Sequence, residues 1–104
     1  MIRKAFKMKI HIDKIREYTK RHNPIWKELY DVLKASGVHN YSIYFDPQTN
    51  YLFGYAEIES EQKWSAISNT EICKKWWKYM KEIMETNRDN SPVSVELIEV
   101  FHID

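Results

Sequence analysis

The sequence predicts an α+β fold in which helices cover one face of a four-stranded antiparallel sheet, and three patterns support this prediction. Residues 4–12 and residues 93–103 alternate between apolar and polar side chains, as half-buried strands do. Residues 38–59 contain two aromatic strands around a turn of Pro, Gln, Thr and Asn. Apolar residues recur every three or four positions in the two remaining intervals, which indicates helices.

The first strand is expected over residues 4–12, because every second residue there is apolar. Asp13 is expected to cap the helix that follows, in which Tyr18 and His22 share one face. The apolar face of the strand consists of Phe6, Met8, Ile10 and Ile12.

This helical region should break at Asn23, because Pro24 disfavours helical geometry in the residue before it. Helical periodicity then resumes at Ile25 and stops at Gly37, a residue type that commonly follows the C-terminal end of a helix. We therefore expect two short helices with an interruption just after His22.

A hairpin follows, with strands over Val38–Asp46 and Tyr51–Glu59 and a turn at residues 47–50. Ser60 and Thr70 are the expected N-caps of two consecutive helical segments, since their hydroxyls can accept hydrogen bonds from the first N–H groups of a helix.

The second of these segments should end near Glu85, and the final strand should cover Val93 to Ile103. The resulting order is β-α-β-β-α-β, which is a ferredoxin-like fold. It uses residues 1–104 as a single domain, because the chain is too short to contain a second core.

One face of such a sheet carries no helices. The strand alternation places Tyr51, Phe53 and Tyr55 on this open face, where three large rings left in water would be unusual. We expect a partner subunit or a ligand to cover them, and dimerisation through the sheet is the simpler explanation.

Composition argues against several classes of protein. The chain has 16 basic and 15 acidic residues, so binding that depends mainly on nucleic-acid phosphates is not expected. No apolar run approaches the roughly 20 residues that a membrane helix needs, and the first residues do not resemble a signal peptide. Cys73 is the only cysteine, so no internal disulfide is expected. We expect a soluble cytoplasmic protein with no nucleic-acid or membrane partner.

His22 is the main candidate for a catalytic residue. Histidine titrates near neutral pH, so it can act as an acid or a base. Tyr18 lies four residues earlier on the same helix face, and the helix breaks just after His22, where a side chain can reach a ligand. A lone histidine on a helix is also often a structural hydrogen bonder, so the residues alone leave both interpretations open. No histidine or cysteine shows the spacing of metal ligands, and no metal is expected.

Tyrosines and tryptophans extend this candidate site. Tyr41 is expected on the same strand face as His39 and Ile43, whereas Trp76 and Trp77 lie about 100° apart around a helix, so one could pack while the other lines a groove. Pyranose sugars have apolar C–H faces that stack on aromatic rings, and hydroxyls that need phenol or imidazole partners. The set favours a neutral sugar as the ligand, although tyrosines are often simply half-buried packing residues.

Four short motifs occur along the chain, and together they cover most of these candidate residues. They are Arg21-His22-Asn23-Pro24-Ile25-Trp26, His39-Asn40-Tyr41, Trp76-Trp77-Lys78-Tyr79-Met80 and Asp89-Asn90-Ser91-Pro92-Val93-Ser94. In this order and at this spacing, they resemble the L-rhamnose mutarotase family, and the similarity extends over essentially the whole chain. Arg88 stands where the family usually has proline, which is a change within a loop.

The resemblance implies a cytoplasmic homodimer with a dimeric α+β-barrel fold that interconverts the α and β anomers of L-rhamnose without a metal or cofactor. It implies that His22 is the proton donor and that Tyr18, Tyr41, Trp76 and Trp77 bind the sugar. The catalytic base stays open among a tyrosine, a water molecule and His22 itself in another step. The selectivity among related sugars, and which tryptophan contacts the sugar directly, also stay open.

Two other functions are compatible with the predicted fold. RNA-recognition domains have the same order of elements and stacking aromatics on the open sheet face, which residues 51–56 loosely resemble. However, the basic residue that begins their motif is absent and the net charge is close to zero. A cofactor-free oxygenase or another dimeric-barrel binding protein is the second alternative, since one fold hosts many functions. The four motifs favour the mutarotase.

Overall fold

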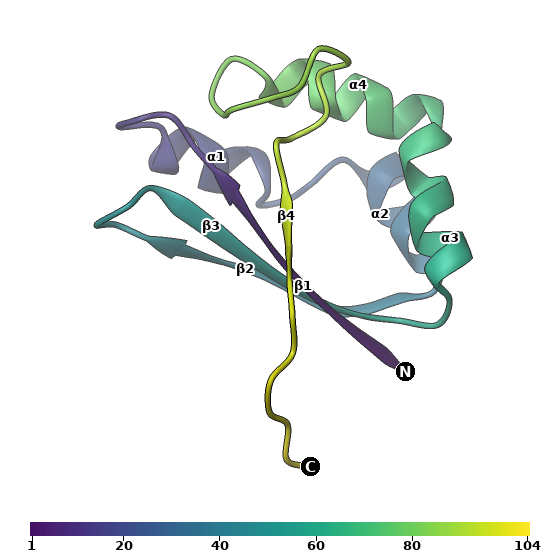
Figure 1. Ribbon diagram of the computed structural model, residues 1–104. Helices are drawn as coiled ribbons and strands as arrows, with labels where there is room; N and C mark the ends of the chain where they lie inside the picture. Colours follow the sequence, from purple (N-terminus) through teal and green to yellow (C-terminus); the bar gives the residue numbers. More distant parts are fainter.

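Strands and helices follow one another in the predicted order in the computed structural model, which describes residues 1–104 (Figure 1). In chain order the elements are β1 (Ile2–Lys9), α1 (Ile15–Arg21), α2 (Lys27–Ala35), β2 (Val38–Asp46), β3 (Tyr51–Ile58), α3 (Glu61–Ala66), the 3-10 helix η1 (Ile67–Asn69), α4 (Glu71–Met80) and β4 (Val95–Leu97).

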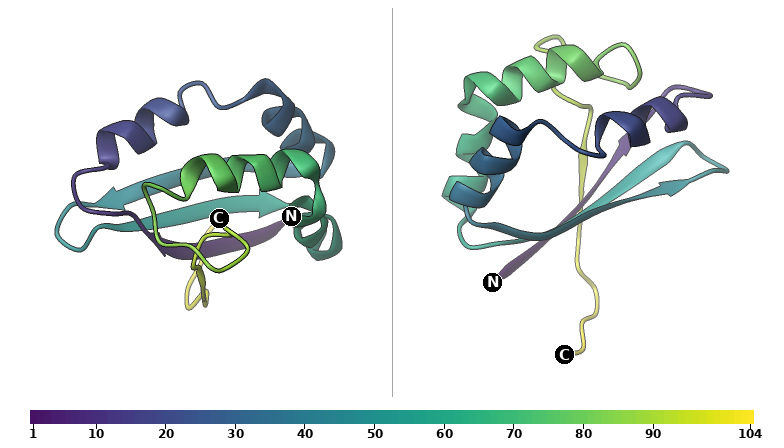
Figure 2. Two further views of the ribbon diagram at one scale, coloured as in Figure 1. Left: turned by 90° about the horizontal axis from the view of Figure 1, so that it is seen from above. Right: turned by 180° about the vertical axis from the view of Figure 1, so that it is seen from behind.

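The four strands form one antiparallel sheet in the order β2-β3-β1-β4. All the helices lie on one face of this sheet, as Figures 1 and 2 show. The hairpin pairs β2 with β3, and β1 lies between β3 and β4. This arrangement confirms the ferredoxin-like fold.

Burial alternates residue by residue along β3, as predicted. The buried set faces the helices and the half-buried set lies on the open face: Leu52, Gly54, Ala56 and Ile58 in the first, Tyr51, Phe53 and Tyr55 in the second. A Cβ atom at Gly54 would lie 2.4 Å from the ring of Phe6. Because glycine has no side chain, the Phe6 ring can lie close against the sheet at this point.

The apolar core between sheet and helices is divided into two clusters. One includes Tyr18 of α1 and Met80 at the end of α4, and the other includes Ile58 of β3 and Cys73 near the start of α4.

No helix has both the length and the apolar character that crossing a membrane requires.

The predicted helix termini in the second half of the chain are confirmed. The hydroxyl of Ser60 accepts a hydrogen bond from the Lys63 N–H at 3.2 Å, and the hydroxyl of Thr70 accepts one from the Cys73 N–H at 3.3 Å. Gly37 follows the C-cap of α2 with a φ of 78°, a left-handed conformation that glycine adopts without steric cost.

The first strand begins and ends earlier than predicted, at Ile2–Lys9. Ile10 is still buried, but Ile12 is 72% exposed, so the predicted apolar face was wrong at that residue. The chain turns at Asp13, whose φ is 64°. Asp13 is therefore not the N-cap of α1. Lys14 occupies that position without a side-chain hydrogen bond.

The end of the chain differs most from the prediction. α4 ends at Met80 rather than near Glu85, and β4 pairs with β1 only over Val95–Leu97 rather than over residues 93–103. Beyond Leu97 the chain projects from the open side of the sheet, away from the helices (Figures 1 and 2). Alternation alone does not make a strand, because backbone N–H and C=O groups also need a neighbouring strand to pair with.

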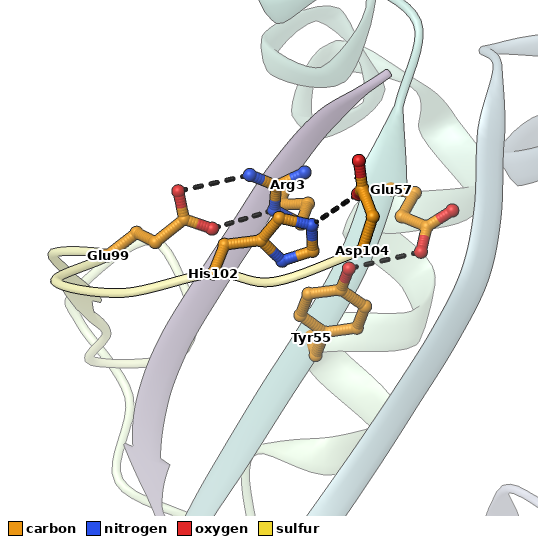
Figure 3. Close-up of polar contacts among 6 residues, drawn as sticks. All are labelled: Arg3, Tyr55, Glu57, Glu99, His102 and Asp104. Atoms are coloured by element: carbon orange, nitrogen blue, oxygen red, sulfur yellow. Dashed lines mark hydrogen bonds and ion pairs between the residues drawn. The ribbon is translucent and has the colours of Figure 1, made fainter.

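The tail over residues 98–104 exposes large apolar side chains to solvent. The exposed fractions range from 77% to 93% for Ile98, Val100, Phe101 and Ile103. Its polar residues make defined contacts, which Figure 3 shows. Arg3 of β1 donates hydrogen bonds of 2.7 and 3.2 Å to the Glu99 carboxylate, and His102 lies 2.8 Å from the carboxylate of Asp104.

Candidate active site

The end of α1 positions His22. The predicted break at Asn23 is confirmed, because α1 ends at Arg21 and α2 begins at Lys27. The carbonyl groups in the last turn of α1 remain open to further hydrogen bonds. The side chains of the two residues before the proline use them. His22 Nδ1 lies 2.9 Å from the Tyr18 carbonyl oxygen, and Asn23 Nδ2 donates to the Thr19 carbonyl oxygen at 2.7 Å. The side chains at the helix end are thus fixed by the helix itself.

Two aromatic rings hold the imidazole of His22. The Tyr18 ring stacks on it with 4.2 Å between the ring centroids, and Trp76 of α4 meets it edge to face at 5.1 Å. Offset stacking and edge-to-face contacts are the arrangements that aromatic rings favour. The imidazole is therefore held by a hydrogen bond, by a stacked ring and by a ring from a second helix.

The aromatic contacts continue from α1 across to the end of α4. Trp26 meets Trp76 edge to face at 5.1 Å and stacks on Tyr79 at 5.1 Å, and the Arg21 guanidinium lies 4.2 Å from the centroid of the Tyr79 ring. Arg21 also forms an ion pair with Glu82, and its side chain is only 8% exposed. We call the series Tyr18, His22, Trp76, Trp26, Tyr79 and Arg21 the aromatic column.

A β-bulge in β2 turns Tyr41 toward the helices. Val38 is buried on the helix side, so an uninterrupted strand would place Tyr41, three residues later, on the opposite face. Asn40 is the extra residue, with a φ of 47° and a hydrogen bond from Nδ2 to the Glu57 carboxylate at 2.9 Å. Tyr41 consequently faces the same way as Ile43.

The predicted common face of Tyr41 and His39 was wrong, because the bulge separates them. His39 Nε2 instead lies 2.9 Å from the Glu59 carboxylate. The ring of Tyr41 meets Phe6 at 6.1 Å and Trp64 at 6.0 Å, both edge to face. An apolar surrounding for Tyr41 was expected, and these two rings provide it.

One cavity of about 1310 Å³ opens under the helices between the two core clusters, a volume that exceeds the roughly 300–1,000 Å³ typical of small-molecule sites. Trp76 packs against the cluster of Tyr18, and Trp77 packs against the cluster of Cys73. Both tryptophans are half-buried and both line the cavity, so neither is only a core residue. The cavity wall includes all five residues predicted for the site: Tyr18, His22, Tyr41, Trp76 and Trp77.

Phe6, Trp64 and the loop residues 89–91 also line the cavity, although none was predicted as a site residue. The two aromatic residues fit the pattern of ordinary core positions, so no local signal distinguishes them. The loop forms part of the fourth motif, which was the signal that could have identified it. It is ordered internally, since the backbone N–H of Ser91 donates to the Asp89 carboxylate at 3.0 Å.

Burial keeps three titratable side chains of the cavity wall neutral. It lowers the pKa of His22 below its usual value near 6.5, although the hydrogen bond to the Tyr18 carbonyl acts in the opposite direction. Burial also raises the pKa of the Tyr18 and Tyr41 hydroxyls well above their usual range. Tyr41 keeps 36% of its surface exposed and lines the cavity. Near neutral pH, His22 therefore presents a neutral imidazole to the cavity, and Tyr18 and Tyr41 present neutral phenols.

Metal ligands and a reactive thiol are the other groups that could carry chemistry in such a site. No three His, Cys, Asp or Glu side chains are grouped so that they could hold a metal ion. Cys73 is buried, and burial raises the pKa of its thiol to about 11, so it stays protonated at neutral pH. The absence of a metal from the reaction stays a prediction.

The fold and cavity define a ferredoxin-like protein whose cavity brings His22 together with phenol hydroxyls and aromatic rings. A sequence profile of the L-rhamnose mutarotase family matches residues 3–103. Curated L-rhamnose mutarotases from Citrobacter koseri and Shigella dysenteriae serotype 1 are 56% and 58% identical over 103 residues, which is 99% of this chain and 99% of each relative. The chain belongs to the L-rhamnose mutarotase family.

Solved structures agree with this assignment. The crystal structure of an L-rhamnose mutarotase from Formosa agariphila is 43% identical, covers 100% of both chains and has a TM-score of 0.92. An antibiotic biosynthesis monooxygenase from Nitrosomonas europaea has a TM-score of 0.64 over 97% of this chain and 100% of its own, at 12% identity. The second likeness concerns the fold alone, so it does not favour the oxygenase alternative.

The bulge at Asn40 provides a test of how Tyr41 is positioned. Asn40→Val should destabilise the fold by about 1–2 kcal/mol, because a branched side chain disfavours the left-handed conformation, and it should weaken the contact of Tyr41 with Phe6. Asn40→Gly is the matched control, since it also loses the hydrogen bond to Glu57 but keeps the backbone geometry. Thermal unfolding and nuclear Overhauser contacts between the two rings measure both effects. Equal behaviour of the two variants would contradict this role for the bulge.

Proposed function

We propose that this protein is an isomerase that interconverts the α and β anomers of L-rhamnose. The identity of 56–58% to L-rhamnose mutarotases over 99% of the chain carries the proposal. The position of His22 at the wall of an aromatic cavity supports it, because anomer exchange needs proton transfer to and from a bound sugar.

The reaction is simple in chemical terms. The ring opens, the C1–C2 bond rotates, and the ring recloses on the other face of the aldehyde. Opening removes a proton from the O1 hydroxyl and delivers one to the ring oxygen O5. Positioned acid–base groups typically contribute about 10²- to 10⁴-fold in rate, which suits a reaction that is already measurable in water.

Five side chains have roles in this proposal. His22 moves protons and delivers one to O5. The hydroxyls of Tyr18 and Tyr41 bind sugar hydroxyls, while the indoles of Trp76 and Trp77 cover apolar C–H surfaces of the sugar. All five line the same cavity, and this supports their assignment to one site.

The activity is tested by saturation transfer between the anomeric protons of L-rhamnose. Catalytic amounts of the protein should speed the exchange, and EDTA should leave the rate unchanged. Parallel measurements on other 6-deoxy sugars and L-hexoses define the selectivity. Exchange no faster than in buffer would refute the proposed function, whereas loss after EDTA and recovery with zinc or iron would refute its independence of metal.

We also propose that the protein is a homodimer, joined through the open face of the sheet as a dimeric α+β barrel. Tyr51, Phe53 and Tyr55 are only half-buried on this face. The projecting tail at residues 98–104 adds four exposed apolar side chains on the same side of the sheet. A second copy of this chain would remove both surfaces from water, which favours association.

Light scattering at micromolar concentration should give about twice 12.7 kDa for the wild-type protein. Phe101→Ser should shift the protein toward the monomer. Ile12→Ser is the matched control, because Ile12 is 72% exposed and Phe101 is 77% exposed, but Ile12 lies outside the tail. A monomeric wild type, or equal effects of the two substitutions, would contradict this dimer.

We place the protein in the cytoplasm and expect no nucleic-acid partner. The single cysteine cannot form an internal disulfide, which suits a reducing compartment. The 16 basic and 15 acidic residues nearly cancel, and this supports a small uncharged substrate rather than a polyanion.

A further inference from the structure

The hydrogen bond at His22 determines which ring nitrogen is available for chemistry. A carbonyl oxygen can only accept a hydrogen bond, so the Nδ1 atom that lies 2.9 Å from the Tyr18 carbonyl carries a proton. In a neutral imidazole, the other nitrogen, Nε2, then has a free lone pair. Because burial lowers the pKa of His22, the neutral ring is the prevailing form near neutral pH. In its resting state, His22 therefore offers a base rather than a proton.

The other groups around the cavity are less suited to act as the base. Tyr18 on α1 stacks on the His22 ring and Tyr41 on β2 lines the same cavity, and burial raises the pKa of both hydroxyls, so they remain protonated. α4 presents the uncharged indole of Trp76 to His22. The other charged or titratable side chains of the cavity wall are Lys4, Tyr30, Lys34, His39, Cys73, Asp89 and Glu96.

Several of these other groups already have partners. Lys4 and Glu96 form an ion pair with each other at 2.7 Å, and His39 contacts the Glu59 carboxylate. Ser91 donates to Asp89 and holds the pKa of that carboxyl below its usual range, which makes it a weak base. Among the groups of the cavity, Nε2 of His22 is thus the lone pair best suited to accept a proton at neutral pH.

We propose that Nε2 of His22 is the catalytic base of ring opening and that it then returns the same proton to the ring oxygen. This proposal rests on the function proposed above. One nitrogen can serve both proton transfers, because O1 and O5 are both bonded to C1 and Nε2 can reach them in turn. His22 is thereby base and acid within one half-reaction.

The proton and electron count balances without a second protein group. Nε2 takes the proton of the O1 hydroxyl, the electron pair of that O–H bond forms the second C1–O1 bond, and the C1–O5 bond breaks toward O5. The imidazolium then donates its Nε2 proton to O5, which leaves an open-chain aldehyde and a neutral His22. After rotation about C1–C2, the same steps in reverse close the ring as the other anomer.

The dependence of the rate on pH tests the proposal directly. As pH falls through the lowered pKa of His22, the exchange rate extrapolated to zero buffer should fall, by about tenfold for each pH unit below that pKa. Above neutral pH the rate should be constant. A rate that instead rises as pH falls through this pKa would mean that protonated His22 starts the reaction, and this result would overturn the proposal.

Controls separate chemistry from unfolding. The unfolded chain binds a proton at His22 more readily than the folded one, so the shift of His22 reduces stability as pH falls below about 6.5. Far-UV circular dichroism at each pH, and recovery of activity on return to neutral pH, show that the fold persists. His11→Asn, a substitution at an exposed histidine outside the cavity, should leave the pH profile unchanged.

Nitrogen-15 NMR of the imidazole rings provides a second readout that does not depend on activity. At neutral pH, the His22 signals, assigned by their absence in His22→Asn, should show a protonated Nδ1 and an unprotonated Nε2. The opposite tautomer would overturn the proposal even if exchange occurs. A folded protein with no exchange at any pH would refute the proposed function itself, and an inverted pH profile would refute only the role of His22 as the base.

Discussion

The interruption of α1 by Pro24 is the constraint on which the site depends. His22 lies at the end of this helix, on the same face as the buried Tyr18, and its Nδ1 bonds back to the Tyr18 carbonyl. This contact occupies Nδ1 and leaves Nε2 free. One local feature of the sequence thus fixes the orientation of the imidazole and its tautomer.

The aromatic column explains how so short a helix can hold a functional group in place. α1 has only seven residues, and isolated helices shorter than about 12–15 residues are marginal in water. Its stability must therefore come from packing, which the column supplies by joining Arg21 to Tyr79 and His22 to Trp76. The same packing excludes water from the ring of His22, so the contacts that stabilise the helix also lower the pKa of the histidine.

Local chemistry made much of this structure predictable. The hairpin, the caps at Ser60 and Thr70 and the break at Asn23 depend on neighbouring residues, and all were predicted. The bulge at Asn40 was not, because periodicity cannot show one extra residue in a left-handed conformation. The predicted extent of the last strand, residues 93–103, was wrong because the length of a strand depends on the partner strand it pairs with. Phe6 and Trp64 join the cavity only through the fold, which brings distant segments together.

The central claim is that the held imidazole of His22 performs chemistry rather than merely supporting the fold. Its most direct test is to measure anomer exchange and thermal unfolding on the same samples of His22→Asn. Tyr18→Phe is the comparison variant, because it keeps the ring that stacks on His22 and the carbonyl that contacts its Nδ1. The account predicts that His22→Asn remains folded and loses about 10²-fold or more in exchange rate. A folded His22→Asn protein with near-normal exchange would contradict it.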